Sequence, residues 1–241
     1  EMCIRDRRTN EIIFPLVVDS RYTVSWGATT YIVCGLVGDN DSTQNPADYG
    51  VTSGWGMFRV RGELPAKFGY TEGTTSVADK RAMFHTDGQS MMFSSSIDDK
   101  KNGYFATKWS NLKDDGTQAS NTASYGVDTD FPMFRLADVY LMLAESVVRG
   151  GTGATASEAL GYVNLVRQRA YGDNSGDITA EEMTVDFFLD ERARELYWEC
   201  VRRTDLIRFG KFTSDAYVWQ WKGNSIDGRG VDSKYNLYPI P

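Results

Sequence analysis

The amino-acid sequence predicts a mainly α fold, in which a TPR-like helical-repeat scaffold carries long loop-rich insertions with short strands. Two observations support this prediction. Residues 131–212 contain strongly patterned helical segments whose charges stand at fixed places along apolar faces. The preceding residues are instead broken by clusters of Gly, Ser, Thr, Asp and Asn, with short β-prone runs between them. Stacked helical hairpins of this length build TPR-like solenoids.

Composition limits the classes of protein and partner. The chain has 241 residues, of which 41% are hydrophobic, and a net charge of −7 that disfavours nucleic acid. Cys3, Cys34 and Cys200 lack the spacing of a zinc ribbon or a disulfide framework. His85, the only histidine, has no ligand-spaced partner, so we expect no metal site and no cofactor. No apolar run reaches the roughly 20 residues that span a bilayer.

We divide the chain into segments that differ in composition and hydrophobic pattern. Residues 1–8 begin with EMCIRDR, which resembles a translated sequencing adapter, and we exclude them from the fold. The rest is interpreted as one domain with a loop-rich region at 9–130, the helical scaffold at 131–212 and a C-terminal loop region at 213–241. A short helix is expected at 63–70. The β-prone runs are 12–18, 29–37, 81–84, 91–93 and 103–109.

The helical scaffold is predicted to start with an antiparallel hairpin. Residues 132–148 are apolar in nearly every direction, so this helix should be buried on most sides. The next helix begins with a Thr155-x-x-Glu158 capping box and ends before Gly172. The short GGTGA connection forces the two helices to run antiparallel. Small residues at which they would approach closely are Ala144, Ala159 and Gly161.

A third helix follows Thr179-x-x-Glu182 or starts at Thr184, and a short further helix is expected at 202–209. The apolar face of the third helix is predicted to comprise Val185, Leu189, Ala193, Leu196 and Cys200. Trp198 is assigned to this helical scaffold.

Glu191 and Glu195 on this third helix are the only arrangement that suggests catalysis. Two carboxylates on neighbouring turns are poorly placed to flank a sugar ring, because acid and base must approach the bond from different sides. Arg194 lies within helical reach of Glu191, so we interpret these charges as ion pairs that tie helices together. The same interpretation covers Arg167, Arg169, Asp205 and Arg208. The sequence therefore predicts that the protein is not an enzyme.

The helical segments resemble the SusD/RagB family. The matching stretches are FPMFRLADVYLMLAES at 131–146, A-x3-VN-x-VR-x-RAY at 159–171, DERARELYWECVRRTDLIRFG at 190–210 and YPIP at 238–241. Cys200 departs from the pattern, since the family usually carries glycine there. The resemblance covers roughly residues 10–241 and is to the C-terminal part of such a protein.

The resemblance implies a function and a location. It implies a non-catalytic glycan-binding lipoprotein on the surface of a Bacteroidetes-type outer membrane, held by a lipid anchor in an N-terminal part outside this sequence. It also implies a partner, a TonB-dependent SusC-like transporter to which captured oligosaccharide or polysaccharide is delivered. The identity of the glycan does not follow from the family.

Aromatic residues in the loops are the candidate ligand-binding residues, because exposed rings can stack on the C–H faces of sugars. The alternative for each is a core anchor beneath a loop. Trp26, Tyr31 and Tyr49 stand in Gly-, Thr- and Asn-rich segments with less reason for burial. The resemblance to the family, which has this shape around SGWG, implies a structural role for Trp55 instead. The candidates are Trp26, Tyr31, Tyr49, Trp55, Phe58, Trp109, Trp219 and Trp221.

Other functions remain open from the residues alone. A TPR-like protein-interaction module would bind a partner in a helical groove and bury the loop tryptophans. A glycoside hydrolase would need two carboxylates facing each other across a cleft. The acidic segment 39–48 would offer oxygen ligands to calcium, although its spacing does not fit an EF-hand.

Overall fold

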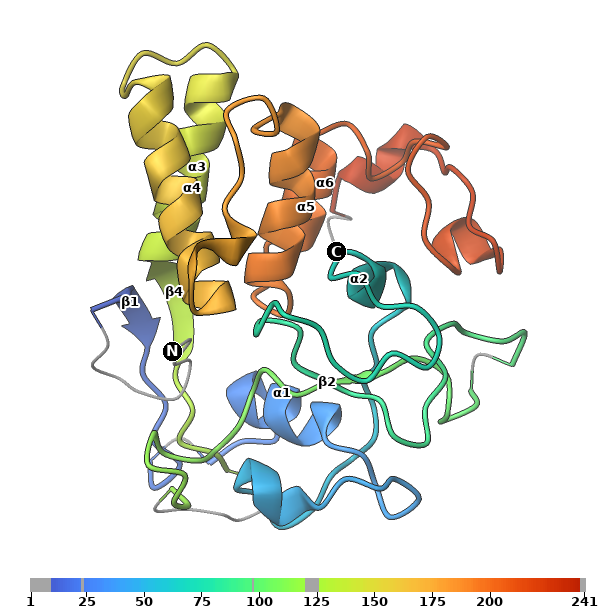
Figure 1. The fold of residues 1–241 in the computed structure, drawn as a ribbon. Coiled ribbons are helices and arrows are strands. Elements are labelled where there is room, and N and C mark those ends of the chain that lie inside the picture. Colours follow the sequence, from blue (N-terminus) through green and yellow to red (C-terminus); the bar gives the residue numbers. More distant parts are fainter. Residues whose placement is uncertain (1–9, 23, 97, 120–125, 239–241) are drawn as a thin grey trace.

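The computed structural model describes residues 10–22, 24–96, 98–119 and 126–238, and it contains a helical scaffold beside a loop-rich region (Figure 1). The mainly α fold with a TPR-like hairpin and loop-rich insertions is confirmed. The segment 1–8, interpreted as an adapter, lies outside the described residues. The scaffold helices are α3 (Leu136–Val148), α4 (Ala156–Tyr171), α5 (Val185–Leu196) and α6 (Arg202–Arg208).

The hairpin of α3 and α4 forms as the sequence predicts. The Thr155 hydroxyl accepts a hydrogen bond from Glu158 N, and the Glu158 carboxylate accepts one from Thr155 N, which completes the capping box. Gly172 ends α4 with a φ of 87°. Ala144 and Ala159 are buried between the helices, but Gly161 is exposed and does not mediate their approach.

The predicted start of the first scaffold helix is wrong. Residues Phe131–Arg135 form strand β4, which pairs antiparallel with β1 (Ile12–Leu16). Ile12 lies opposite Arg135, and Leu16 lies opposite Phe131. The partner strand stands more than a hundred residues away in the sequence, so the local helical pattern of residues 132–148 could not reveal it.

The run at 29–37, expected to be β-prone, is a helix instead. Helix α1 spans Ala28–Leu36 and buries Val33, Cys34 and Leu36 on one face. This burial follows the helical period, so packing overrides the strand preference of the β-branched residues. Tyr31 is left on the exposed side of the helix.

The third predicted helix ends earlier than expected. α5 begins after Thr184, whose hydroxyl accepts a hydrogen bond from Phe187 N, and it ends at Leu196. Trp198 and Cys200 follow with left-handed φ values of 62° and 64°. Cys200 is therefore exposed rather than part of the apolar face of α5.

The loop-rich region packs around a core that it shares with Tyr197 of the scaffold segment. The buried side chains include Val33, Tyr70, Tyr104 and Trp109. The expected run at 91–93 contains no strand, and the runs at 81–84 and 103–109 contribute only a two-stranded pair. The remaining elements are the helix α2 (Glu63–Ala66), the strands β2 (Phe84–His85) and β3 (Phe105–Ala106), and 3₁₀ turns at Pro46–Tyr49, Asn174–Gly176, Lys222–Asn224 and Ser233–Asn236.

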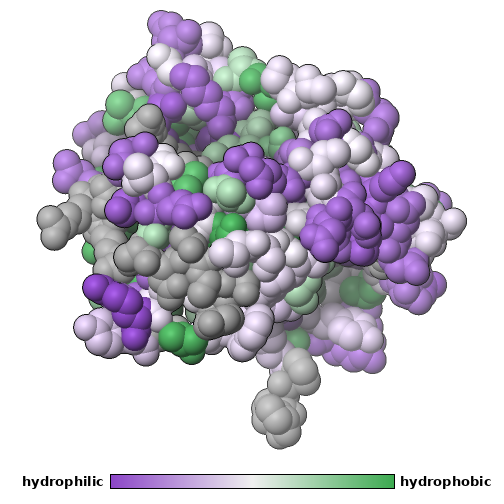
Figure 2. All heavy atoms as spheres, turned by 90° about the horizontal axis from the view of Figure 1, so that it is seen from below, coloured by the Kyte–Doolittle hydropathy of each residue, from purple (hydrophilic) through white to green (hydrophobic). Residues whose placement is uncertain are grey.

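The surface differs between faces of the molecule. The β1–β4 ribbon exposes apolar side chains, among them Phe14 and Phe134, whose ring centroids are 6.4 Å apart. The face seen in Figure 2 is instead mostly hydrophilic or intermediate among the described residues, with isolated hydrophobic ones. Among the described helices, none is long and apolar enough to cross a membrane.

Candidate functional site

The carboxylates of Glu191 and Glu195 on α5 are buried and held by arginines from several elements. Arg81 Nη1 lies 2.7 Å from Glu191 Oε1 and 3.1 Å from Glu195 Oε2. Arg135 Nη1, from β4, lies 2.5 Å from Glu195 Oε1. Their other cationic partners are Arg167, Arg169 and Arg194. This confirms the prediction that the charges tie the scaffold together.

The arginines keep both carboxylates ionised. Burial alone would raise the pKa of Glu191, but the charge of Arg81, joined by other arginines, outweighs it and lowers that pKa to about 2. The pKa of Glu195 also lies well below its usual value, because Arg135 and further arginines outweigh burial. A glycosidase needs a carboxylic acid of raised pKa to protonate the leaving group. Neither residue meets that requirement.

A different group of side chains forms a continuous row of aromatic rings, which we call the aromatic ladder. The ring centroids of Trp26 and Trp55 are 5.9 Å apart, and those of Trp55 and Tyr31 are 6.2 Å apart. Tyr31 meets Phe58 edge-on at 4.9 Å, and Phe58 lies 5.2 Å from Trp198. Each separation falls within the roughly 4.5–7 Å at which aromatic rings interact.

One end of the ladder is open to solvent. The side chain of Trp26 is 64% exposed and that of Tyr31 is 42% exposed. Trp55, Phe58 and Trp198 are half-buried, and they pack between these exposed rings and the core. An exposed ring backed by fixed rings loses little side-chain entropy when a ligand covers it, so the ladder suits the apolar face of a sugar.

Local backbone contacts hold the ladder in place. Trp55 N donates to Cys34 O of α1 at 2.8 Å, which presses the SGWG loop against the helix. A Cβ at Gly54 would meet Gly38 O at 2.0 Å, so this approach requires glycine. The exposed side of α1 presents Tyr31 beside Trp55. The sequence thus brings two distant aromatic residues together through one helix and one tight loop.

The remaining candidates in the loop-rich region are packed differently. Tyr49 is half-buried and packs against the core. Trp109 is only 1% exposed, and its ring stacks on Phe131 with centroids 5.6 Å apart and planes at 15°. The expectation that Trp109 contacts ligand is therefore not supported, because both faces of its ring lie in the protein core.

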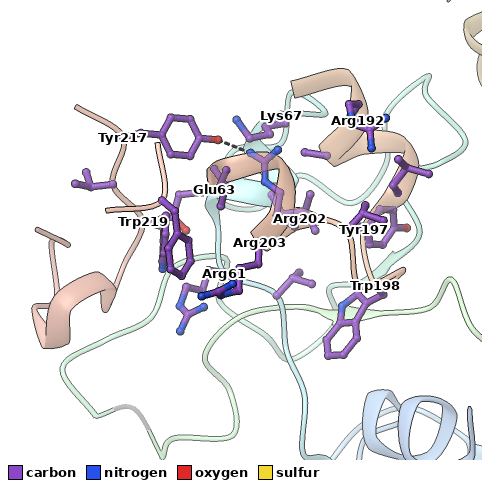
Figure 3. Close-up of a pocket in the computed structure, with 18 of the residues that line it drawn as sticks. Arg61, Glu63, Lys67, Arg192, Tyr197, Trp198, Arg202, Arg203, Tyr217 and Trp219 are labelled. Carbon is purple, nitrogen blue, oxygen red and sulfur yellow. Dashed lines mark hydrogen bonds between the residues drawn. The ribbon is translucent and has the colours of Figure 1, made fainter. Parts of the chain in front are cut away.

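Trp219 and Trp221 belong by sequence to the C-terminal loop region. This region follows α6 (Figure 1). Trp219 is half-buried, 6.0 Å from Phe212, and lines a cavity of about 500 Å³ shown in Figure 3. Trp198 lines the same cavity and so belongs both to it and to the aromatic ladder. Trp221 is half-buried and borders a neighbouring, more open cavity.

Sequence reasoning missed Trp198 as a candidate by leaving it in the helical scaffold. After Leu196 the chain turns through left-handed backbone at Trp198 and Cys200, and the ring of Trp198 packs against Phe58. The glycine that the SusD/RagB pattern usually carries at the position of Cys200 was the available signal. Glycine is favoured where φ is positive, so it marks a turn rather than a continuing helix.

The acidic segment 39–48 is engaged by a lysine. Lys100 Nζ lies 2.5 Å from Asp39 Oδ2 and 3.1 Å from Asp41 Oδ2. Within the described part of the chain, no group of three or more His, Cys, Asp or Glu side chains is arranged to hold a metal ion. The contacts of this segment thus favour a structural ion-pair cluster over a calcium site.

Comparison with known proteins identifies relatives in sequence. The family model described as the SusD family matches residues 86–241. The starch-binding protein SusD of Bacteroides thetaiotaomicron is 33% identical over 270 residues, which cover 96% of this chain and 46% of that protein. The chain thus spans about half the length of this relative.

Solved structures share the fold. The surface glycan-binding protein A from Bacteroides thetaiotaomicron superposes with a TM-score of 0.67 at 21% identity, covering 98% of this chain and 49% of that one. The structure of a protein of the same name and organism in complex with laminarihexaose gives a TM-score of 0.64 at 22% identity, covering 100% of this chain and 51% of that one. At these identities the likeness establishes the architecture.

Proposed function

The chain belongs to the SusD family, and from this membership we propose that it captures oligosaccharides on the aromatic ladder without catalysing a reaction on them. The observation that carries the proposal is the exposed end of the ladder, where Trp26 and Tyr31 stand beside the supporting ring of Trp55. Rings in this arrangement offer a preformed surface to successive sugar units.

The relatives suggest which ligand to try first. The relative at 33% identity is named for starch binding, and one structure of the same fold contains laminarihexaose. Both ligands are glucose polymers without charge. A neutral glucan is therefore the starting probe, and the ladder is the part of this chain on which we expect it to lie.

The part of the proposal that excludes catalysis rests on the two buried carboxylates. Glu191 and Glu195 are occupied by arginines, and their lowered pKa values oppose the protonated state that a general acid needs. We expect the purified protein to release no reducing sugar from a glucan to which it binds.

We further propose a location and a partner. Membership of the family supports a surface-exposed lipoprotein of the outer membrane that delivers its ligand to a TonB-dependent SusC-like transporter. Co-purification of the full-length protein with such a transporter from detergent-solubilised outer membranes tests this assignment. Recovery of the protein alone, under conditions that preserve other membrane complexes, would contradict it.

Affinity electrophoresis of the full-length protein tests glycan capture. Native gels containing starch or laminarin should retard the wild type, and Trp26→Ala should largely restore its mobility. Tyr162→Ala is the matched control, because Tyr162 stacks on Tyr140 at 4.8 Å on the hairpin of α3 and α4, away from the ladder (Figure 1). Equal retardation of wild type and Trp26→Ala would remove the ladder as the site. No retardation by any polysaccharide would favour the protein-interaction module instead.

A further inference from the structure

The cavity that Trp198 and Trp219 line is strongly cationic. It lies between α5, α6, the segment around α2 and the C-terminal loop region (Figure 3), and its volume of about 500 Å³ is within the usual range of ligand sites. One carboxylate, Glu63, lines it. The cationic side chains that line it are Arg59, Arg61, Lys67, Arg192, Arg202 and Arg203.

Scaffold contacts neutralise only part of this charge. Lys67 Nζ lies 2.5 Å from Asp190 Oδ1, and Arg192 Nε lies 2.9 Å from Asp205 Oδ2. No carboxylate of the described residues forms an ion pair with the other four, Arg59, Arg61, Arg202 and Arg203. Four arginines without an ion pair outweigh the single carboxylate of Glu63, so the cavity carries a positive potential that attracts an anion.

The arginines of α6 keep donors available. Arg202 donates through Nη2 to the Tyr217 hydroxyl at 2.6 Å and through Nη1 to Leu189 O at 2.5 Å. Arg203 donates through Nη2 to Tyr235 O at 2.8 Å. These neutral partners orient the guanidinium groups without cancelling their charge. A guanidinium carries five N–H donors, so several remain for an anion.

Two residues of the cavity lining each have one buried polar atom without a hydrogen-bond partner among the described residues. They are Arg59 Nε, a donor, and Glu63 Oε2, an acceptor. Burial also lowers the pKa of Arg59. Glu63 Oε1 already accepts a hydrogen bond from Gln220 N at 2.6 Å. Both atoms have almost no solvent-accessible area, so neither is open to a ligand in the cavity.

The cavity also has aromatic walls. Figure 3 shows Arg61, Arg202 and Arg203 grouped between Trp219 on one side and Trp198 on the other. The ring of Trp198 contacts Phe58, so the cavity begins where the aromatic ladder ends. Trp198 is therefore the residue that the ladder and the cavity share.

We propose that this cavity binds an acidic sugar unit, a saccharide ring bearing a carboxylate or a sulfate ester. The ring faces fit the indole walls, and the anionic group pairs with the guanidinium groups. A simple inorganic anion offers no such ring face. The proposal rests on glycan capture by the ladder and narrows its ligand to a glycan with an acidic unit.

Isothermal titration calorimetry of the full-length protein tests the proposal with matched oligosaccharides. One carries a uronic acid, a second is the same molecule with its carboxyl reduced to a neutral alcohol, and a third is its sulfate ester. We expect at least one acidic ligand to bind about tenfold more tightly than the neutral one at low salt, with a smaller advantage at high salt. The two acidic arms distinguish carboxylate from sulfate.

Two substitutions test whether the preference for acidic ligands arises in the cavity. Arg61 is exposed and forms no ion pair with a described carboxylate, so Arg61→Gln should leave folding intact, remove most of the acidic advantage and spare binding of the neutral ligand. Lys113→Gln, at an exposed lysine outside the cavity, changes the net charge equally and should have no effect.

The outcomes separate the two proposals. Equal affinity for acidic and neutral ligands, or an acidic advantage that survives Arg61→Gln, would overturn the acidic site while leaving glycan capture intact. Failure of Trp26→Ala to weaken the neutral ligand would overturn capture on the ladder instead.

Discussion

The rings of Phe58 and Trp198 lie 5.2 Å apart, with their planes at 45°. Phe58 belongs to the loop-rich region, whereas Trp198 stands on the turn that follows α5. Their contact joins the aromatic ladder to the cationic cavity that Trp198 also lines. Trp198 is therefore shared by the ladder, whose exposed end is Trp26, and by the cavity that the arginines of α6 line.

Trp26 and Trp55 are expected to act as a unit in glycan binding. Each single alanine substitution should weaken affinity about tenfold, equivalent to about 1.4 kcal/mol. Because the two rings are in contact, the double variant should lose clearly less than the product of the single losses. Titration calorimetry with a glucan oligosaccharide measures this cycle, and strictly multiplicative losses would show that the rings bind independently.

Gly54→Ala should damage binding through the backbone. The new Cβ would meet Gly38 O at 2.0 Å, so the SGWG loop must move away from α1 and carry Trp55 with it. We expect affinity to fall as far as in Trp55→Ala, together with a lower melting temperature. Gly153→Ala is the control, because a Cβ there meets no atom within 4 Å. Unchanged affinity in Gly54→Ala would show that Trp55 is not part of the glycan-binding site.

Trp109→Ala should affect stability rather than recognition. The ring is buried and stacked on Phe131, so its removal leaves a cavity that costs about 3–5 kcal/mol of unfolding free energy. Chemical denaturation measures that loss. The fraction that stays folded should bind glycan with wild-type affinity, and a selective loss of binding at unchanged stability would return Trp109 to the site.

Acid should destabilise the scaffold in a defined range. The pKa of Glu191 falls from 4.5 to about 2 on folding, so the ionised carboxylate stabilises the protein fully above pH 4.5 and less as the pH drops towards 2. The depressed pKa of Glu195 acts in the same direction. Melting temperatures should be steady from pH 7 to about 5 and then fall.

The variant Glu195→Gln tests whether the buried ion pairs of Glu195 cause the loss of stability in acid. Glu195→Gln leaves buried arginine charge uncompensated, so it should lower the unfolding free energy at pH 7 by about 3–5 kcal/mol and flatten the acid decline. If the melting temperature of the variant fell in acid as steeply as that of the wild type, groups other than Glu195 would cause the decline.

Local signals predicted the scaffold well. The capping box of Thr155 and Glu158 and the glycine after α4 define that helix from neighbouring residues alone. The partnership of Glu191 and Arg194 also follows from helical spacing. These features depend on contacts within a few residues, which a pattern in the sequence can express.

The binding surface could be predicted only in part, because it depends on contacts between distant residues. Trp26 and Trp109 both stand in polar segments, yet the first is exposed and the second is stacked on Phe131. Tyr31 joins the ladder from helix α1, where the sequence predicted a β-prone run at 29–37. Trp198 was missed because its orientation depends on a left-handed turn at two non-glycine residues.

A crystal structure of the full-length protein with a bound glucan oligosaccharide tests the central claim most directly. We predict sugar rings stacked over Trp26 and Tyr31, with the chain of sugars running towards Phe58 and Trp198. Sugars bound in a groove of the α3–α4 hairpin, or on any surface that leaves Trp26 and Tyr31 uncovered, would contradict the assignment of the aromatic ladder as the glycan-binding site.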